Sequence, residues 1–247
     1  MCINESLFEN TRDKIVGIQR ERQGIGTLSE KTIHAVLKNY YAPDTDMHEI
    51  PIENFVADIY TGQEIIEIQT RAFNKMRRKL DAFLPVYPVT IVYPIPHIKW
   101  LSWIDEETGE TSPKRKSPKT GNAYMAFIEL YKIRSYLSNP NLHLKVVLID
   151  MEEYRLLNGW SRDKKKGSER YDRIPVKFAE EVCIDRREDY MQFVPYDLPE
   201  TFTTKDFAKH AKIQLRLAQT VLLILTDLEI VVRVGKQGHS YLYEVNE

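Results

Sequence analysis

Apolar side chains recur at helical spacing over residues 28–41, and Pro43 marks the end of this predicted helix. The next two segments, 50–60 and 64–70, have the composition of β-strands. Between them, Gly62-Gln63 fits the two central positions of a type II′ turn. The pattern therefore predicts a helix followed by a β-hairpin.

The mixture of helical and strand periods continues toward residue 175. The predicted elements are a helix at 71–84, a buried strand at 87–95, an exposed turn-rich insertion at 105–121, a helix at about 123–137, a strand at 144–150 and a basic irregular stretch at 158–175. Asp150, Glu152 and Glu153 end the strand at 144–150, and we expect them to face solvent. This succession predicts an α/β fold.

The segment from Asp197 onward has its own pattern of helix, turn, helix and two short strands. Thr203 is a plausible N-cap for its first helix, and Gly235–Gly238 separates the strands. This order looks like a small winged helix-turn-helix. We therefore predict two domains, 1–195 and 197–247.

The longer helix of this module, 214–228, is the predicted recognition helix. Gln214, Arg216 and Gln219 would be available to base edges and Lys236 to phosphate, while Leu215, Ala218, Leu222 and Leu225 would face inward. Residues 200–247 hold six Lys or Arg and six Asp or Glu, so the module is neutral. A role in packing or dimerisation therefore remains as open as DNA reading.

Composition narrows the protein class. Of the 247 residues, 43% are hydrophobic and 29% charged, which predicts a sizeable core and excludes wholesale disorder. The net charge of −1 means that affinity for nucleic acid has to come from local patches. Two cysteines are too few for a disulfide framework. The polar N-terminus does not fit a signal peptide, and Asp227 and Glu229 interrupt the most apolar stretch, which excludes it as a membrane span. We expect a soluble cytoplasmic protein without a membrane partner.

Three carboxylates draw attention within the first predicted helix and the hairpin. On a helical wheel, Glu30 shares a stripe with Ile33 and His34, where a carboxylate is costly unless it is paired or bound to a cation. A half-exposed first-turn acid that the helix dipole favours is the alternative. His34 is the one histidine that we expect to line the same cleft as Glu30.

The predicted turn sets the register of the hairpin. It pairs Ile59 with Ile66 and so places Asp58 opposite Glu67, where like charges repel. Two opposed carboxylates and a third on a core-facing helix predict a bound cation. A ligand set made only of oxygen atoms suits Mg²⁺ or Mn²⁺ rather than zinc.

These residues carry a resemblance to a known family. A helix with Glu30, then Asp58, then the triplet Glu67-Ile68-Gln69 and the basic helix 71–84 resemble the PD-(D/E)XK nuclease superfamily over roughly residues 25–150. The resemblance implies a restriction endonuclease-like αβββαβ core with a mixed central sheet.

The resemblance also implies roles for the residues. Asp58 and Glu67 would bind the divalent metal, and Glu30 would assist as an accessory ligand. Gln69 stands where the family usually has Lys, and Ala57 stands where it usually has Pro. Glutamine can hold a water molecule by hydrogen bonding but has no charge to stabilise developing negative charge.

The function that follows is metal-dependent endonuclease cleavage of nucleic-acid phosphodiester bonds, of a restriction or defence type. We predict Mg²⁺ or Mn²⁺ as cofactor and double-stranded DNA as partner, with a homodimer as a candidate assembly. Two alternatives stay open: a catalytically inactive nucleic-acid-binding regulator with the same fold, and a protein-interaction module whose acids are structural.

Basic residues supply the predicted contacts to nucleic acid. Arg71 and Lys75 follow the triplet, while Arg77, Arg78 and Lys79 are expected to form a solvated helix face. A second basic stretch interleaves its cations with aromatic residues. The contacts predicted there are Arg162, Lys164, Lys165, Lys166, Arg170 and Arg173, and the cluster Lys114-Arg115-Lys116 with Lys119 is a further candidate.

Overall fold

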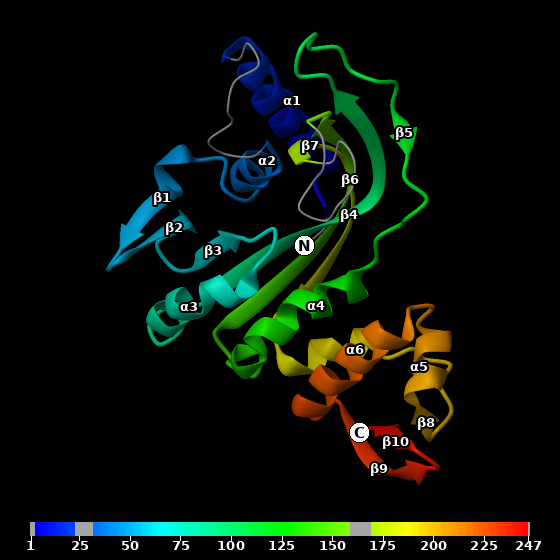
Figure 1. Cartoon of the computed structure of the whole chain (residues 1–247). Helices are drawn as coiled ribbons and strands as arrows, with labels where there is room; N and C mark the ends of the chain where they lie inside the picture. Colours follow the sequence, from blue (N-terminus) through cyan, green and yellow to red (C-terminus); the bar gives the residue numbers. More distant parts are fainter. Residues whose placement is uncertain (1–2, 23–31, 159–168, 247) are drawn as a thin grey trace. The chain divides into compact units, whose positions relative to one another are not determined.

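The structure, a computed structural model, describes residues 3–22, 32–158 and 169–246 (Figure 1). The helices are α1 (Glu5–Arg22), α2 (Thr32–Tyr41), α3 (Arg77–Phe83), α4 (Phe127–Leu130), α5 (Thr204–His210) and α6 (Leu215–Asp227). The strands are β1 (His48–Ile52), β2 (Phe55–Tyr60), β3 (Ile65–Ile68), β4 (Val89–Ile104), β5 (Arg115–Lys116), β6 (Leu142–Leu156), β7 (Glu169–Ile184), β8 (Phe202–Thr203), β9 (Val231–Gln237) and β10 (Ser240–Val245). In this described part of the chain, no helix is long and apolar enough to cross a membrane.

The strands of the described residues form two sheets. The central sheet has the order β1-β2-β3-β4-β6-β7, with β5 paired to β4, and the small sheet has the order β8-β10-β9. In the central sheet β1 and β2 are antiparallel whereas β3 and β4 are parallel, so this sheet is mixed. The small sheet is antiparallel. The predicted α/β class with a mixed central sheet is confirmed.

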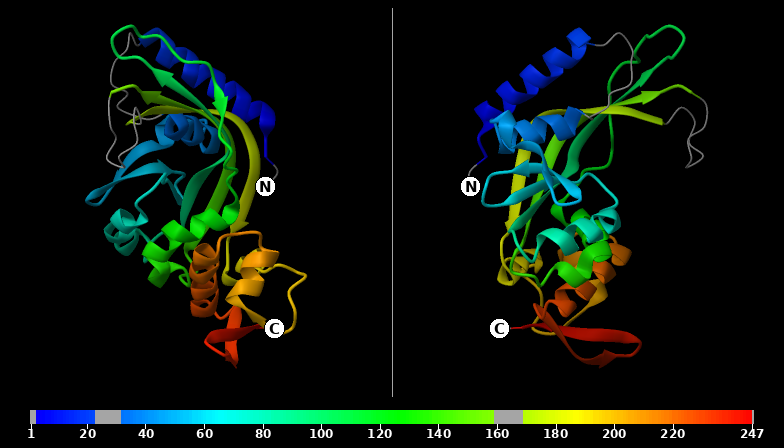
Figure 2. Two further views of the ribbon diagram at one scale, coloured as in Figure 1. Left: turned by 45° about the vertical axis from the view of Figure 1, so that its right-hand side comes forward. Right: turned by 90° about the vertical axis from the view of Figure 1, so that its left-hand side faces the viewer.

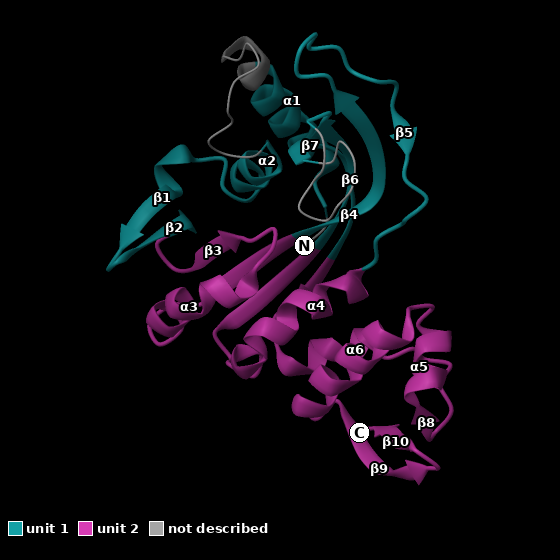
Figure 3. Ribbon diagram, viewed as in Figure 1, with its two compact units in different colours: residues 1–61, 94–122, 147–181 teal, residues 62–93, 123–146, 182–247 magenta. Residues whose placement is uncertain are grey.

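The chain divides into two compact units (Figure 3). The first unit comprises Met1–Thr61, Pro94–Asn122 and Val147–Glu181, and the second comprises Gly62–Tyr93, Ala123–Val146 and Val182–Glu247. The long strands β4, β6 and β7 each contribute residues to both units. All of residues 197–247 belong to the second unit.

In the first unit, α1 lies beside α2, as both views of Figure 2 show. The Phe8 ring of α1 is 5.8 Å from the Tyr40 ring of α2 and 5.4 Å from the Phe178 ring of β7. The Asp172 carboxylate of β7 accepts a hydrogen bond from the Thr32 backbone N–H at 3.3 Å, at the first residue of α2. Aromatic packing and this bond together hold α2 against β7.

The segment 50–60, predicted as one strand, is instead an antiparallel pair. Ile52 of β1 is opposite Phe55 of β2, so the chain reverses at Glu53-Asn54. Glu53 adopts a left-handed φ of 52°, a conformation that non-glycine residues rarely take. The single-strand prediction was wrong because this turn contains no Gly or Pro to mark it.

In the second unit, β3 and β4 are parallel neighbours, with Glu67 opposite Ile91. Parallel strands need a crossover connection, which here consists of a 3₁₀ turn at Phe73–Met76 followed by α3. This confirms the helical prediction for the segment. The four apolar residues that recur at helical spacing in this segment are all buried: Phe73, Met76, Leu80 and Phe83.

The later elements confirm the order of the prediction more closely than its boundaries. The predicted helix at 123–137 is a 3₁₀ turn (Ala123–Ala126), α4 and a second 3₁₀ segment (Tyr131–Tyr136). The predicted strand at 144–150 extends over all of β6. The stretch expected to be irregular becomes the regular strand β7 from Glu169 onward, so that prediction was wrong there.

The C-terminal segment has the predicted order of two helices and two strands. Thr203 caps α5, because its hydroxyl oxygen accepts from the Asp206 N–H at 3.3 Å while Asp206 accepts from the Thr203 N–H at 2.9 Å. On α6, Ala218, Leu222 and Leu225 are buried as predicted, whereas Leu215 is exposed. Leu215 lies in the first turn of α6, where the inward prediction was wrong.

Gly121 lies where its segment closely approaches β4, and this close contact gives the first testable prediction. A Cβ atom there would lie 2.0 Å from the Pro96 carbonyl oxygen, so Gly121→Ala should lower the free energy of unfolding by about 2 kcal/mol in urea titrations. Gly17→Ala in α1 is the control, since nothing lies within 4 Å of its added methyl group. It should leave the stability unchanged or raise it by about 0.5–1 kcal/mol.

Candidate functional site

Glu67 lies within β3, a strand whose residues are all buried. Packing of its isoleucine neighbours does not require a carboxylate, and burying one is costly unless it is paired. Lys79 of α3 supplies the partner, with Nζ 2.6 Å from Glu67 Oε2 and side chains only 18% and 5% exposed. Glu67 and Lys79 therefore form a buried ion pair within the second unit.

The placement of Lys79 corrects the sequence analysis. Arg77 and Arg78 are exposed as expected, but Lys79 is not part of a solvated face. It lies one helical turn after the buried Met76, and its ammonium is 5.8 Å from the Phe83 ring centroid. The long aliphatic stem of a lysine can follow an apolar surface in this way.

Gln69 directly follows β3. Its backbone N–H donates to the Val92 carbonyl at 3.0 Å, which keeps Gln69 in register with β4. Its side-chain amide nitrogen donates to the Arg71 carbonyl oxygen. Arg71 and Lys75 both have exposed side chains, as a contact to nucleic acid would require.

Asp58 belongs to the first unit and Glu67 to the second. Ala57 and Ile59 of β2 are fully buried, and Asp58 between them is partly exposed. Its Oδ2 atom is 3.2 Å from Nε2 of His34 in α2, so α2 and β2 bring this acid and this histidine together. Glu30 lies outside the described residues.

The predicted donors fit the predicted metal by their chemistry. Carboxylate oxygens are the hard donors that Mg²⁺ and Mn²⁺ prefer, and Mg²⁺ is commonly held by one or two carboxylates with waters and substrate phosphates. Across residues 3–22, 32–158 and 169–246, no group of three or more His, Cys, Asp or Glu could hold a metal ion.

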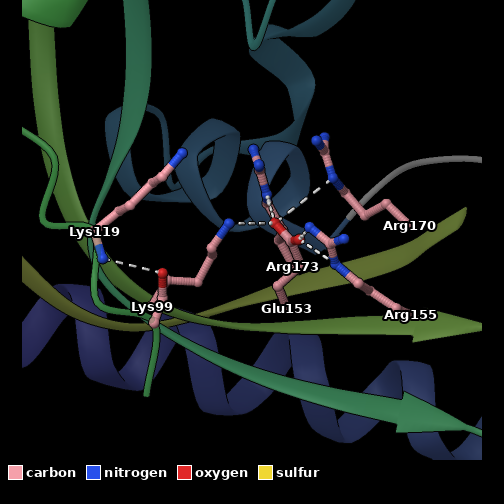
Figure 4. A network of polar contacts seen from close by, with 7 residues as sticks. Lys99, Lys119, Glu153, Arg155, Arg170 and Arg173 are labelled. Carbon is pink, nitrogen blue, oxygen red and sulfur yellow. Dashed lines mark hydrogen bonds and ion pairs between the residues drawn. The ribbon is translucent and has the colours of Figure 1, made fainter. Parts of the chain in front are cut away.

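A second arrangement of charges lies in the first unit. We name it the Glu153 cluster: Glu153 of β6 with Lys99 of β4, Arg155 of β6, and Arg170 and Arg173 of β7 (Figure 4). Four cationic side chains lie within 4 Å of one carboxylate. The shortest nitrogen–oxygen distances are 2.5 Å for Arg155, 2.9 Å for Arg173, 3.3 Å for Lys99 and 3.7 Å for Arg170.

Glu153 has no solvent exposure, which sets the electrostatics of this cluster. Burial alone would raise the pKa of its carboxyl group, but Arg173, Lys99 and the hydrogen bonds from Arg155 and Arg173 outweigh it and lower the pKa to about 2. Burial lowers the pKa of Lys99, and the nearby arginines act in the same direction against the attraction of Glu153. The cluster thus crowds cations around a fully ionised acid.

Glu153 was wrongly expected to face solvent. Strand β6 continues to Leu156, and Glu153 follows the two-residue period of the buried Ile149 and Met151. That alternation was the available signal, and a length estimate that ended the strand at residue 150 concealed it. Lys99 was missed as a site residue because its partner Glu153 was assigned to the surface, and Arg155 was noted only as the start of the basic stretch.

The other predicted nucleic-acid contacts divide into described and undescribed residues. Arg170 and Arg173 belong to the Glu153 cluster, whereas Arg162, Lys164, Lys165 and Lys166 lie outside the described residues. Arg115 and Lys116 form the exposed strand β5, opposite Leu101 and Trp100 of β4. Lys119 is also exposed, and Figure 4 shows its side chain on the same side as Lys99.

The C-terminal candidates are exposed. Gln214, Arg216 and Gln219 are at the surface of α6 and its N-cap. On the β9–β10 hairpin, the Lys236 ammonium is 5.2 Å from the Tyr241 ring centroid and the Arg233 guanidinium is 4.5 Å from it. Two cations over one partly exposed aromatic ring form a basic face on this hairpin.

Comparison with known proteins gives a family but no activity. A family model described as a domain of unknown function (DUF8091) matches residues 31–185. An uncharacterized protein of Treponema pallidum (strain Nichols) is 26% identical over 192 residues, which cover 75% of this chain and 74% of that protein. No solved structure matches the chain.

The depressed pKa of Glu153 predicts how stability depends on acid. Its folded-state pKa of about 2 lies below the ordinary value of 4.5, so its contribution is complete above about pH 5 and is lost as the pH falls toward 2. The shift corresponds to roughly 3 kcal/mol in the free energy of unfolding. Urea titrations should show that Glu153→Gln loses this part of the pH dependence, and Glu152→Gln serves as the control. Identical pH profiles for wild type and Glu153→Gln would contradict the assignment.

Proposed function

The chain belongs to the family described as a domain of unknown function (DUF8091), and we propose that it is a metal-dependent nuclease that hydrolyses phosphodiester bonds of nucleic acid, with double-stranded DNA as substrate. One observation carries the proposal. The Lys79 ammonium lies 2.6 Å from the carboxylate of Glu67. Glu67 precedes Gln69 by two residues. This largely buried cation beside Glu67 would offset the absence, at position 69, of the lysine that is usual in the PD-(D/E)XK superfamily.

The order of elements supports the same proposal. Helix α2, strands β1, β2 and β3, helix α3 and strand β4 follow one another in the αβββαβ order that the resemblance implies. Asp58 lies in β2, Glu67 in β3 and Gln69 just after β3, which are the positions that the resemblance assigns to the metal ligands and the water-positioning residue. We extend the proposal to a restriction endonuclease-like core and a C-terminal winged helix.

The proposed chemistry assigns metal binding and water positioning to different side chains. The resemblance assigns the Asp58 and Glu67 carboxylates as ligands of Mg²⁺ or Mn²⁺, with Glu30 as an accessory ligand. When bound, the ion supplies charge neutralisation at the scissile phosphate and a water of lowered pKa. The Gln69 amide would orient the attacking water by hydrogen bonding.

Lys79 would have two tasks in this scheme. Without metal, its ammonium compensates the buried negative charge of Glu67, which would otherwise destabilise β3. With substrate bound, the same charge would stabilise the negative charge that develops on the phosphate during hydrolysis. Lysine suits this second task as a compact point charge on a flexible stem.

A nucleic-acid-binding regulator without catalysis is the second candidate. The observation that favours it is the hydrogen bond from the Gln69 amide to the Arg71 carbonyl, which uses the amide within the protein rather than on a water. A plasmid-nicking assay distinguishes the two candidates, because the nuclease should nick plasmid with Mg²⁺ but not with EDTA, whereas the regulator should nick in neither.

Lys79 gives the sharpest test of catalysis. Lys79→Gln should slow Mg²⁺-dependent plasmid nicking by about 10²-fold, as removal of a charge-stabilising donor does in other enzymes. Adding Gln69→Lys to that variant should restore much of the rate, because a cation then stands at the position that is usual in the PD-(D/E)XK superfamily. Arg187→Gln removes an exposed cation paired with Glu188 and Glu229, and it is the control that should keep the wild-type rate. Equal rates in wild type and Lys79→Gln would contradict the role of Lys79.

Metal binding is tested separately through thermal stability. Mg²⁺ at about ten times its Kd should stabilise the wild type by about 1.4 kcal/mol, or raise its Tm by roughly 3–5 °C. Asp58→Asn removes one of the two ligand charges, so its Tm should respond much less. If the wild-type Tm does not change in millimolar Mg²⁺ or Mn²⁺, Asp58 and Glu67 are structural acids and the metal site is contradicted.

A further inference from the structure

We propose that the Glu153 cluster is a phosphate-binding site for the backbone of a polynucleotide, and that Glu153 is the residue that positions its arginines. The proposal rests on the proposed function for the identity of the ligand and not for the existence of the site. It involves no hydrolysis and no metal.

The balance of charge in the cluster indicates an anionic ligand. Lys99, Arg155, Arg170 and Arg173 bring four positive charges within 4 Å of the single negative charge of Glu153. Among the described residues, Lys99, Arg155 and Arg173 alone outnumber the one carboxylate that they contact, so they repel each other in a place of low exposure. A second anion beside Glu153 would relieve that repulsion, whereas a metal cation would increase it.

The cations keep donor groups to offer. In the part of the chain that is described, Arg173 contacts Glu153 through Nε, which leaves both of its terminal nitrogens for a ligand. Lys99 makes one hydrogen bond to Glu153, although an ammonium can donate several. The side chains of the four cations are 16–36% exposed, so a ligand can contact them from solvent.

Glu153 restricts the directions in which these donors point. Arg155 donates to Glu153 Oε1 through both Nε and Nη2, and Arg173 donates to the other oxygen. The buried carboxylate thus holds two guanidinium groups on neighbouring strands in fixed orientations. Planar guanidinium groups in defined orientations match the oxygens of a phosphate group.

The surroundings favour a polymer over a single ion. Beyond the cluster, Arg115, Lys116 and Lys119 of the first unit are exposed, and Arg115 and Lys116 are paired to β4, whereas Lys114 forms an ion pair with Glu152 at 2.5 Å. The Lys119 side chain lies on the same side as Lys99 in Figure 4. A row of cations next to a cluster with fixed donors suits an anion that repeats along a chain, as the phosphates of a nucleic acid do.

Binding in EDTA tests the site without cleavage. The probe is a fluorescein-labelled DNA duplex of about one to two helical turns, followed by anisotropy over a salt series. Arg173→Gln should lower the affinity about tenfold and reduce the salt slope by about 0.9, the amount for one duplex phosphate contact. Lys99→Gln and the milder Arg170→Gln should act in the same direction, whereas Arg187→Gln should behave as wild type.

Inorganic phosphate gives a second readout, by melting temperature against chloride at equal ionic strength. Phosphate should raise the Tm of the wild type, and it should raise the Tm of Arg173→Gln less. The increase should be larger in Glu153→Gln, where the cations have lost their internal anion. Equal increases in wild type and Arg173→Gln would overturn phosphate binding by the cluster, and an equal increase in Glu153→Gln would overturn the charge balance from which that binding is inferred.

The outcomes separate this proposal from the nuclease proposal. Unchanged duplex affinity and salt slope in Arg173→Gln and Arg170→Gln would overturn the site and leave an internal ion network. A phosphate effect on Tm with unchanged duplex affinity would identify a site for free phosphate and overturn the polynucleotide assignment. Loss of duplex binding in the cluster variants would support the site even if the wild type nicks no plasmid.

Discussion

Compensation of buried charge constrains this structure more than any other single interaction. Glu153 is completely enclosed as an ionised acid, and burying a lone carboxylate would cost several kcal/mol even after relaxation. Strands β4, β6 and β7 jointly supply the cations that make this burial tolerable. Because these partners come from three strands, the pairing register of those strands and the electrostatics of the cluster depend on each other.

Two other buried acids, Glu67 and Glu129, have their negative charge compensated by different partners. Glu67 has a lysine partner from the crossover helix α3, so the packing of α3 on β3 and the charge of Glu67 are linked. Glu129 of α4 is buried as well, and it accepts from the Phe73 N–H at 2.9 Å and pairs with Lys132 at 2.6 Å. Each buried acid thereby fixes one element against another, in addition to what apolar contacts provide.

The numbers of partners distinguish two kinds of chemistry. The Glu67–Lys79 pair brings one negative and one positive charge together in the second unit. Among the described residues, the Glu153 cluster holds more cations than acids, a balance that suits an added anion. We propose hydrolysis for the first arrangement and phosphate binding for the second on this physical ground. Both fit one substrate class, a nucleic acid, but each can be present without the other.

Local periodicity determined much of this protein. The helical stripe of Phe73, Met76, Leu80 and Phe83, the N-cap at Thr203 and the order of the C-terminal elements could be read from the chain, because the burial of neighbouring residues follows from secondary structure alone. The acids Asp58 and Glu67 could be selected in the same way, as charges among apolar residues.

Tertiary structure decided which charges meet. Residue patterns did not predict four features: the reversal at Glu53-Asn54, the length of β6, the inward position of Glu153 and the Lys79–Glu67 pair. Lys99, Glu153 and Arg173 lie far apart in the sequence and come together only through strand pairing. An ion pair across strands depends on the register in which distant segments pair. Local residue patterns do not determine that register.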